Sequence, residues 1–289
     1  MKKIVILGCE NSHADIFLDF IRDREEYSDV EVVGVYSCEK EAMDKLVEKY
    51  GVKAMSSYDE AVDVVDGIII TARHGDNHYK YAAPYIKKGI PMFIDKPITV
   101  DEDEAIRFMK ECKKNGVRVT GGSCCAHDVD AHALQREIES GALGKVFSGF
   151  VCAPIEMNSE HGGYFFYAQH LVGIMQTVFG LRPKSVRSAK SENGLRALYC
   201  YDGFEVSAHY NDGCRKYHAT VVAPKGVSSR TLGISIDCFV EEFDRFYRLL
   251  NGEEQIDSYS DFITAVHIMT ATYRSMLSGK EESITYSEI

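Results

Sequence analysis

A chain of 289 residues, 45% hydrophobic and 27% charged, has the composition of a globular protein and is long enough for two domains. The formal net charge of −11 argues against a nucleic-acid partner, which would require a basic face to neutralise phosphates. No apolar stretch approaches the ~18–20 residues that span a bilayer, and the apolar run after Met1-Lys2-Lys3 is too short for a signal peptide.

The first 120 residues alternate short apolar runs with amphipathic ones. The apolar runs are rich in β-branched residues, as expected where helices cover both faces of a parallel sheet. The predicted strands are Ile4–Leu7, Val30–Tyr36, Gly67–Thr71, Met92–Ile94 and Val117–Thr120. The predicted helices are Ala14–Asp23, Glu39–Tyr50, Tyr58–Val64, Tyr79–Lys88 and Asp101–Asn115. This alternation predicts a doubly wound, Rossmann-type domain over residues 1–121.

Local signals support this assignment. Ser57 to Glu60 and Thr99 to Glu102 have the spacing of capping boxes, in which a hydroxyl and a carboxylate satisfy the first amides of a helix. Glycines follow three of the predicted helices, where a left-handed C-cap would need them: Gly51, Gly89 and Gly116.

After Gly121-Gly122 the pattern changes to that of a mostly antiparallel sheet with helices. The predicted helices are Ala131–Glu139, Tyr164–Phe179, Phe239–Leu250 and Phe262–Leu277. The predicted strands are Lys145–Cys152, Ser185–Ala189, Arg196–Tyr201, Phe204–Tyr210, Tyr217–Ala223 and Leu232–Ile236. Hairpin-length turns separate several of these strands. We expect residues 122–289 to form a second α/β domain, with the last helix, about 261–278, able to pack back on the first.

The cysteines and a cluster of polar residues do not predict a metal site. Nine cysteines without a C-x-x-C pair favour reduced thiols and a cytoplasmic protein. Adjacent Cys124 and Cys125 are interpreted as ordinary thiols rather than a redox pair. His127, Asp128, Asp130 and His132 form a compact group that could bind a divalent metal, but Asp128 and Asp130 lie in a polar connector, which favours a solvated loop.

An ordered set of motifs resembles the glucose-fructose oxidoreductase/inositol dehydrogenase (Gfo/Idh/MocA) family. The segment from Thr71 to His78 precedes a helix, a glycine, a strand and then Asp95-Lys96-Pro97, where the family has Glu-Lys-Pro. Further motifs at the family spacing are Ser140-Gly-Ala-Leu-Gly-Lys145, Gly162-Gly163 with His170 and Phe179-Gly180, and Asp261 with Tyr273-Arg-Ser-Met and Gly279. The resemblance implies a nicotinamide cofactor, a sugar, polyol or related hydroxy substrate, and an open second sheet that often mediates oligomers.

The phosphate-binding turn departs from the family pattern. G-x-G-x-x-G should begin at Gly8, but Glu10 and His13 replace its second and third glycines. In one interpretation Asn11, Ser12 and backbone amides bind phosphate while Glu10 points away. In the other, dinucleotide binding is weakened or lost, because like charges about 4 Å apart cost ~4 kcal/mol at an effective dielectric of about 20.

The resemblance also implies the other cofactor contacts. Ser37 ends the second strand, where an acid or an arginine usually selects between NAD and NADP; its sequence context weakly favours NAD. Thr71, His78 and Asp95 complete the expected cofactor side. His78 is expected either to line the cleft or to cap the following helix.

On the substrate side the resemblance implies Lys96 and His170 as the catalytic pair that handles the hydroxyl proton. Both would contact the substrate together with Tyr167. Two departures leave the substrate open: Phe166 replaces the aspartate that usually precedes the histidine by one helical turn, and Ser123-Cys124-Cys125 replaces Asn-x-Arg.

Three functions therefore remain open. The first is an NAD(P)-dependent oxidoreductase, expected as a dimer or tetramer acting on a small molecule. The second is a non-catalytic, ligand-binding or regulatory member of the same scaffold that has lost dehydrogenase activity. The third is an enzyme in which the scaffold supports another reaction, such as lyase or hydrolase chemistry.

Overall fold

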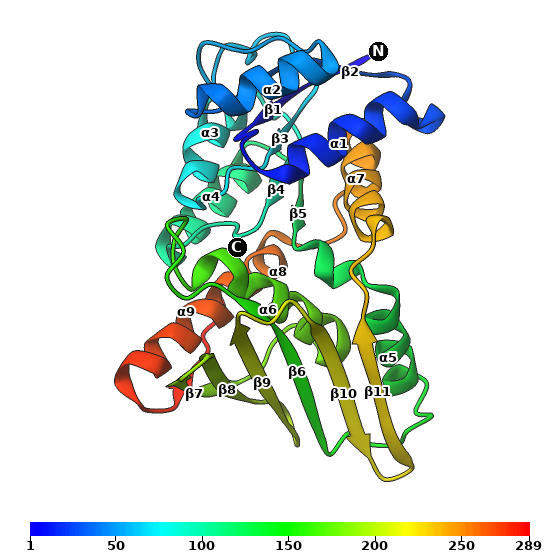
Figure 1. Cartoon of the computed structure of the whole chain (residues 1–289), viewed down its shortest axis with the longest axis vertical. Helices are drawn as coiled ribbons and strands as arrows, with labels where there is room; N and C mark the ends of the chain where they lie inside the picture. Colours follow the sequence, from blue (N-terminus) through cyan, green and yellow to red (C-terminus); the bar gives the residue numbers. More distant parts are fainter. The chain divides into compact units, whose positions relative to one another are not determined.

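The computed structural model describes all 289 residues, which divide into two compact units (Figure 1). Unit 1 comprises Met1–Gly122, Val240–Phe262 and Ile289, and unit 2 comprises Ser123–Phe239 and Ile263–Glu288. The segment 240–262, which the sequence analysis placed in the second domain, therefore groups with unit 1, whereas the last long helix groups with unit 2. No helix is both long and apolar enough to cross a membrane.

Unit 1 contains a five-stranded sheet in the order β2-β1-β3-β4-β5, with every neighbouring pair parallel. Its strands are β1 (Lys2–Leu7), β2 (Val30–Tyr36), β3 (Gly67–Ile70), β4 (Met92–Asp95) and β5 (Val119–Gly122). Its helices are α1 (Ser12–Asp23), α2 (Lys40–Tyr50), α3 (Asp76–Ile86), α4 (Glu102–Lys114) and α8 (Tyr259–Phe262), with a short 3-10 turn, η1 (Glu25–Tyr27). The predicted doubly wound half is confirmed. Because β1 lies between β2 and β3, the carboxyl end of β1 is the crevice where such sheets bind ligands.

Two local predictions in unit 1 were wrong. Residues 58–64 form successive turns rather than a helix, because the Glu60 carboxylate bonds Ser56 and Lys53 instead of capping a helix. The N-cap of α4 is Asp101 rather than Thr99, since the Asp101 carboxylate accepts from the Glu104 amide. The predicted positive φ of the three capping glycines is confirmed.

Helix α7 (Ile236–Leu250) supplies much of the aromatic core of unit 1. The Phe243 ring lies 5.5 Å from Phe17 and 4.6 Å from Tyr27, and Phe243 is fully buried. A Cβ at Gly67 would lie 2.3 Å from Leu250 Cδ2, so glycine at the start of β3 leaves room for the side chains of α7. The apolar residues of α7 explain why the segment groups with unit 1.

Unit 2 is a seven-stranded sheet in the order β11-β10-β6-β9-β8-β7-β12, antiparallel except for the β6–β9 pair. Its strands are β6 (Ser148–Ile155), β7 (Ser185–Ser191), β8 (Gly194–Cys200), β9 (Glu205–Asp212), β10 (Tyr217–Ala223), β11 (Gly226–Leu232) and β12 (Glu282–Ser283). Its helices are α5 (Val129–Glu139), α6 (Phe165–Phe179) and α9 (Thr264–Ser278), with a 3-10 turn, η2 (Cys124–His127). The prediction of a mostly antiparallel second sheet is confirmed.

The predicted strand Leu232–Ile236 was wrong, and β11 takes its place six residues earlier in the chain. β11 pairs with β10 through a tight hairpin in which Ala223 faces Gly226. Its residues are largely polar and exposed because it forms an edge of the sheet, so the strand lacks the apolar pattern on which the prediction depended. Ile236 instead begins α7.

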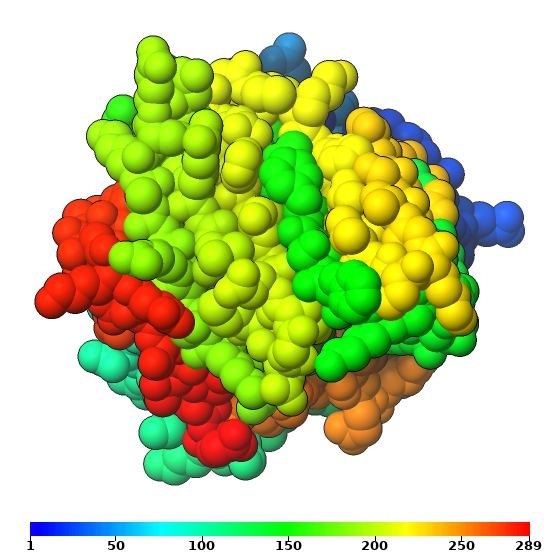
Figure 2. All heavy atoms as spheres, turned by 90° about the horizontal axis from the view of Figure 1, so that it is seen from below, coloured from blue at the N-terminus to red at the C-terminus, as the bar shows by residue number.

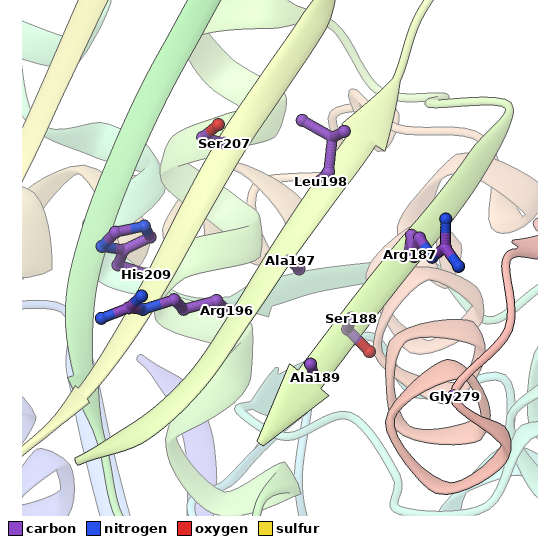
Figure 3. A pocket seen from close by; sticks show the side chains of 9 residues that line it. All are labelled: Arg187, Ser188, Ala189, Arg196, Ala197, Leu198, Ser207, His209 and Gly279. Carbon is purple, nitrogen blue, oxygen red and sulfur yellow. The ribbon is translucent and has the colours of Figure 1, made fainter. Parts of the chain in front are cut away.

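Helices cover only one face of the unit 2 sheet. Helices α5, α6 and α9 contact β11, β6 and β7, and alternate strand residues are buried against them. On the other face, yellow-green atoms of the chain, which include β8 and β9, form the surface (Figure 2). A shallow hollow there is lined by polar and apolar side chains, among them Arg187, Arg196, Leu198 and His209 (Figure 3). Unit 2 therefore presents an open sheet face.

Candidate active site

The turn from β1 into α1 is packed tightly against the end of β3. Gly8 has a φ of +78°, and a Cβ there would lie 2.3 Å from the Ala72 backbone. The Thr71 hydroxyl, fully buried, donates to the Gly8 carbonyl at 3.0 Å. Gly8 and Thr71 thus hold a tight turn between β1 and the start of α1. In such a turn, the backbone amides and the dipole at the helix N-terminus can bind a pyrophosphate.

The Glu10 side chain turns toward the residues that follow β2 and β3, the two strands that flank β1. One carboxylate oxygen accepts from the Ser37 hydroxyl at 2.7 Å, and the other accepts from the Arg73 amide at 3.1 Å. Ser37 is itself buried and its hydroxyl also accepts from the Glu39 amide. The Glu10 carboxylate is therefore held at the carboxyl end of β2, beside Ser37. This is the position where dinucleotide-binding domains carry the acid that bonds a ribose hydroxyl.

The residues that begin α1 are tied to the end of β4. Asn11 is the N-cap, and its side-chain oxygen accepts from the His13 amide at 3.3 Å. Its side-chain nitrogen donates to Asp95 Oδ2 at 3.1 Å, and His13 Nδ1 lies 2.8 Å from the same oxygen. Ser12 is exposed, with its hydroxyl 3.5 Å from Asn11 Oδ1. His13, which replaces the third glycine, therefore anchors the helix through a side chain.

Asp95 is fully buried at the end of β4. Burial opposes its ionisation, but His13 and the Lys96 backbone amide stabilise the carboxylate, and the net result is a lowered Asp95 pKa. With Asn11, His13 and the Lys96 amide around it, the carboxylate has its partners within the protein. Asp95 thus positions the β1–α1 turn and the residue that follows it.

Lys96 follows Asp95 in the chain, and His78 contacts the loop that carries Lys96. Lys96 is 4% exposed and precedes a cis peptide bond to Pro97. His78 is fully buried, with Nε2 2.8 Å from the Ala72 carbonyl and Nδ1 3.2 Å from the Ile98 carbonyl. Burial lowers the pKa of His78. His78 therefore links the loop after β3 to the loop that carries Lys96 and is itself enclosed by protein. Its side chain makes no cap for α3, which begins at Asp76.

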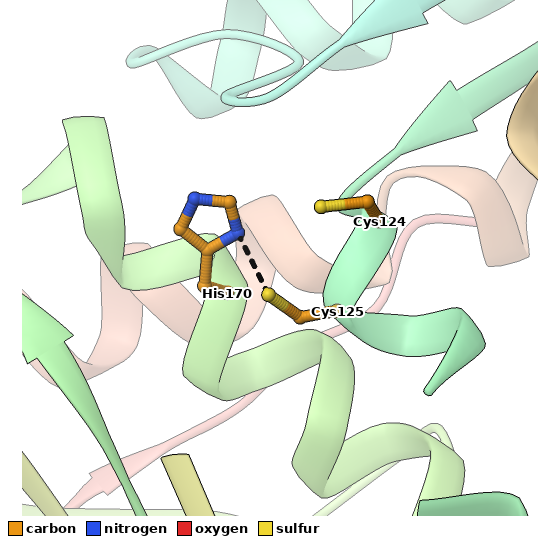
Figure 4. Close-up of side chains that lie close together, drawn as sticks. All are labelled: Cys124, Cys125 and His170. Atoms are coloured by element: carbon orange, nitrogen blue, oxygen red, sulfur yellow. Dashed lines mark hydrogen bonds between the residues drawn. The ribbon is translucent and has the colours of Figure 1, made fainter. Parts of the chain in front are cut away.

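In unit 2, His170 on α6 faces η2, the turn that begins at Cys124. His170 Nδ1 lies 2.7 Å from the Ser123 hydroxyl and 3.3 Å from Cys125 Sγ. The Cys124 thiol lies beside Cys125 and His170 (Figure 4). Ser123, Cys124, Cys125 and His170 are all buried. None of the nine cysteines forms a disulfide.

Aromatic side chains surround His170. The Tyr167 ring lies 5.2 Å from the imidazole and its hydroxyl accepts from Arg215 at 2.7 Å. The Tyr217 ring lies 6.5 Å from the imidazole; burial, with the nearby Cys125, raises the Tyr217 pKa. The Phe166 ring lies 5.0 Å from the His161 ring, in a tilted arrangement. The residue one helical turn before His170 is Phe166, so no carboxylate stands where the family resemblance implies an aspartate.

The structure places the sequence-predicted residues in two groups. Those of the cofactor side, with Lys96, belong to unit 1, while Tyr167 and His170 belong to unit 2. Sequence reasoning missed that Ser123, Cys124 and Cys125 surround His170, some 45 residues away in the chain. It also missed that Glu10 contacts Ser37. Both sets of residues stand where the family motifs have other residue types, which marks the positions as unusual. A motif does not reveal which groups the new side chains contact.

The N-terminal region matches a known family. Residues 2–123 match the sequence model GFO_IDH_MocA, an oxidoreductase family with an NAD-binding Rossmann fold. Inositol 2-dehydrogenase of Burkholderia vietnamiensis is 28% identical over 166 residues, which cover 55% of this chain and 45% of that protein. Glucose-6-phosphate 3-dehydrogenase of Bacillus subtilis is 26% identical over 151 residues, covering 51% and 41%. The chain thus matches less than half the length of these curated relatives.

Solved structures share the fold along the whole chain. Scyllo-inositol dehydrogenase from Lactobacillus casei, crystallised with NAD(H) and scyllo-inositol, superposes with a TM-score of 0.85 at 13% identity, covering 98% of this chain and 99% of that one. Myo-inositol 2-dehydrogenase from Lactobacillus plantarum gives a TM-score of 0.85 at 15% identity, with coverage of 98% and 99%. Over residues 2–123 the chain is similar in sequence to the Gfo/Idh/MocA family of oxidoreductases, and over its whole length it shares the fold of these solved dehydrogenases.

Proposed function

We propose that this protein is an NAD-dependent oxidoreductase that acts on a hydroxyl of a sugar or cyclic polyol. The observation that carries the proposal is the Glu10 carboxylate held against Ser37 at the end of β2. A carboxylate offers about four acceptor positions, and Ser37 and the Arg73 amide use two of them. The remaining positions suit ribose hydroxyls, whereas a 2′-phosphate would be repelled. This favours NAD over NADP.

The residues of the turn fit the rest of the adenosine diphosphate. Gly8 lets the backbone approach closely, since no side chain fits between it and Ala72. Asn11 and Ser12 stand at the start of α1, where amides and the helix dipole favour a pyrophosphate. Glu10 is held away from this helix start by its two hydrogen bonds, which removes the objection that its charge would repel phosphate. When bound, the nicotinamide supplies the hydride acceptor.

Lys96 and His170 are the proposed groups for the hydroxyl proton. A buried lysine donates to the hydroxyl oxygen, and an imidazole accepts its proton as the hydride leaves. The Asp95 network and His78 hold the loop of Lys96, while Ser123 orients His170 through Nδ1. Tyr167, beside His170, is the proposed substrate contact of the same unit.

Two further features of the whole protein belong to this proposal. The open face of the unit 2 sheet, with its mixed apolar and polar side chains, supports association of copies of this chain into a dimer or tetramer. Nine cysteines with no disulfide among them support a reducing compartment, the cytoplasm.

A second candidate, a ligand-binding member without catalysis, is favoured by a specific observation. Asp95, which stands for the family's glutamate, is occupied by Asn11 and His13, and Phe166 stands where the family has an aspartate. Such a protein would bind a dinucleotide or sugar through the same turn without transferring a hydride.

Calorimetric titration with NADH and NADPH tests cofactor binding, and a screen of inositol isomers and sugar phosphates for NAD reduction at 340 nm then separates the two candidates. The oxidoreductase proposal expects micromolar NADH binding and turnover that falls at least 100-fold in Lys96→Ala and His170→Ala. Lys88→Ala and His132→Ala are the matched controls. Binding without turnover on any polyol or sugar would support the second candidate, and no binding by a folded protein would reject the first.

A further inference from the structure

Three metal-ligating donor atoms converge in unit 2, and the proposed oxidoreductase function uses only one of the residues that carry them, His170. Two come from the adjacent thiols of η2, Cys124 and Cys125, and the third is a ring nitrogen of His170 on α6. The three ligand atoms all lie within 4.8 Å of one another. The residues are 3%, 1% and 6% exposed, so the cluster is buried as a whole. Figure 4 shows both sulfurs directed toward the imidazole.

The backbone around the cluster is built to bring these groups together. Ser123 caps η2, its hydroxyl accepting from the Cys125 amide, and this fixes the two thiols on a tight turn. One turn along α6 from His170, Gly173 packs beside η2, where a Cβ would be in ordinary contact with Ala126 at 3.4 Å. The Thr177 hydroxyl then donates to the Ala126 carbonyl at 2.9 Å. Both ligand-bearing elements are thus held against each other by contacts outside the cluster.

The donor set and the spacing match a known coordination chemistry. Two thiolates with one imidazole are the ligands of zinc sites that keep a fourth position open. With Zn–S near 2.3 Å and Zn–N near 2.0–2.1 Å, tetrahedral geometry places sulfur and nitrogen about 3.5 Å apart. The observed separation of Cys125 Sγ and His170 Nδ1 is 3.3 Å. A buried thiol with a purely structural role does not need an imidazole beside it. A disulfide between the adjacent Cys124 and Cys125 would close a strained ring.

We propose that Cys124, Cys125 and His170 bind one divalent cation of zinc type. Ser123, with its hydroxyl 2.7 Å from His170 Nδ1, borders the fourth position, and Tyr217 lies beside Cys125. The site goes beyond the proposed oxidoreductase function and shares His170 with it. Nδ1 is the ring nitrogen that faces Cys125 and Ser123, so proton acceptance in the proposed oxidoreductase function belongs to Nε2. Because both proposals use His170, metal binding is measured in the absence of cofactor and substrate.

The test is a cobalt titration of the full chain, purified under reducing conditions and stripped with a chelator. The proposal expects one equivalent of Co²⁺ to bind, with thiolate-to-cobalt charge-transfer absorption in the near ultraviolet that Zn²⁺ abolishes by displacement. Cys124→Ser, Cys125→Ser and His170→Gln should each weaken Co²⁺ binding at least tenfold and reduce the absorption. Cys152→Ser, a half-buried thiol of the same unit on β6, is the matched control and should bind as the wild type does.

Several outcomes would overturn the site. Absence of charge-transfer absorption at saturating Co²⁺, or an unchanged spectrum in Cys125→Ser, would reject it. Circular dichroism checks that each variant is folded, and the three separate variants keep the test meaningful if one of them is not. The cobalt titration contains no NAD and no polyol. A protein that fails to bind NADH can therefore still bind cobalt, and a protein that fails to bind cobalt can still bind NADH. The two proposals therefore fail independently.

Discussion

Replacing Glu10 by glutamine removes the charge at the end of β2 while keeping the shape of the side chain. In the wild type the carboxylate accepts from Ser37 at 2.7 Å and from the Arg73 amide at 3.1 Å. Glutamine can keep both contacts, because its oxygen accepts from Arg73 and its nitrogen donates to the Ser37 hydroxyl. The turn from Gly8 to α1 should therefore persist, and only the electrostatics at the proposed ribose position should change.

The magnitude follows from the hydrogen-bond type. A hydrogen bond to a charged acceptor contributes about 1.5–3 kcal/mol, against about 0.5–1.5 kcal/mol for a neutral one. Loss of roughly 1–1.5 kcal/mol corresponds to about a tenfold weaker NADH affinity. For NADPH the change has the opposite sign, because up to ~4 kcal/mol of repulsion between like charges about 4 Å apart is relieved. The ratio of NADPH to NADH affinity should rise at least tenfold.

Calorimetric titration of both cofactors measures this ratio directly. Glu39→Gln is the matched control: Glu39 lies on the same loop, two residues from Ser37, but its side chain is 50% exposed and its charge is screened by solvent. It should change neither affinity by more than about twofold. If Glu10→Gln strengthened NADH and NADPH binding by the same factor, Glu10 would act on the pyrophosphate that both cofactors share, and the assignment to the ribose would be wrong.

Three further perturbations test other parts of the structure. Phe243→Ala should destabilise unit 1 by about 3–5 kcal/mol, since it removes a fully buried ring, whereas Phe147→Ala, 59% exposed, should cost less than about 0.5 kcal/mol in denaturant unfolding. Burial lowers the pKa of His78 below its ordinary 6.5, so the unfolded chain takes up a proton first as the pH falls. Stability that is complete above pH 6.5 is then lost below it, and His78→Gln should show a flatter pH dependence in urea unfolding; identical slopes would contradict this. Phe150→Glu, on the open sheet face beside His209, should lower the mass measured by light scattering if that face joins copies of the chain, and an unchanged mass would exclude the face.

The sequence by itself determined the architecture of the first half. The spacing of hydrophobic residues, the β-branched runs and the capping glycines are local signals that act over a few residues. For Val30–Tyr36 the predicted and observed bounds are the same. It also determined that the β1–α1 turn starts at Gly8 and that Glu10 and His13 make it unusual. The positions proposed for the site came from this order of motifs, without any knowledge of what each side chain contacts.

Only the tertiary structure decided where the replaced side chains go. Glu10 meets Ser37 and His13 meets Asp95 because β1, β2 and β4 end at one edge of the sheet. The same holds for the move of α7 into the core of unit 1 and for Cys125 beside His170. Each joins residues tens or hundreds of positions apart, and such contacts depend on how whole elements pack. The local sequence pattern does not predict this packing. The hydrophobic effect is non-directional, so which side chains contact each other is determined only when the elements assemble.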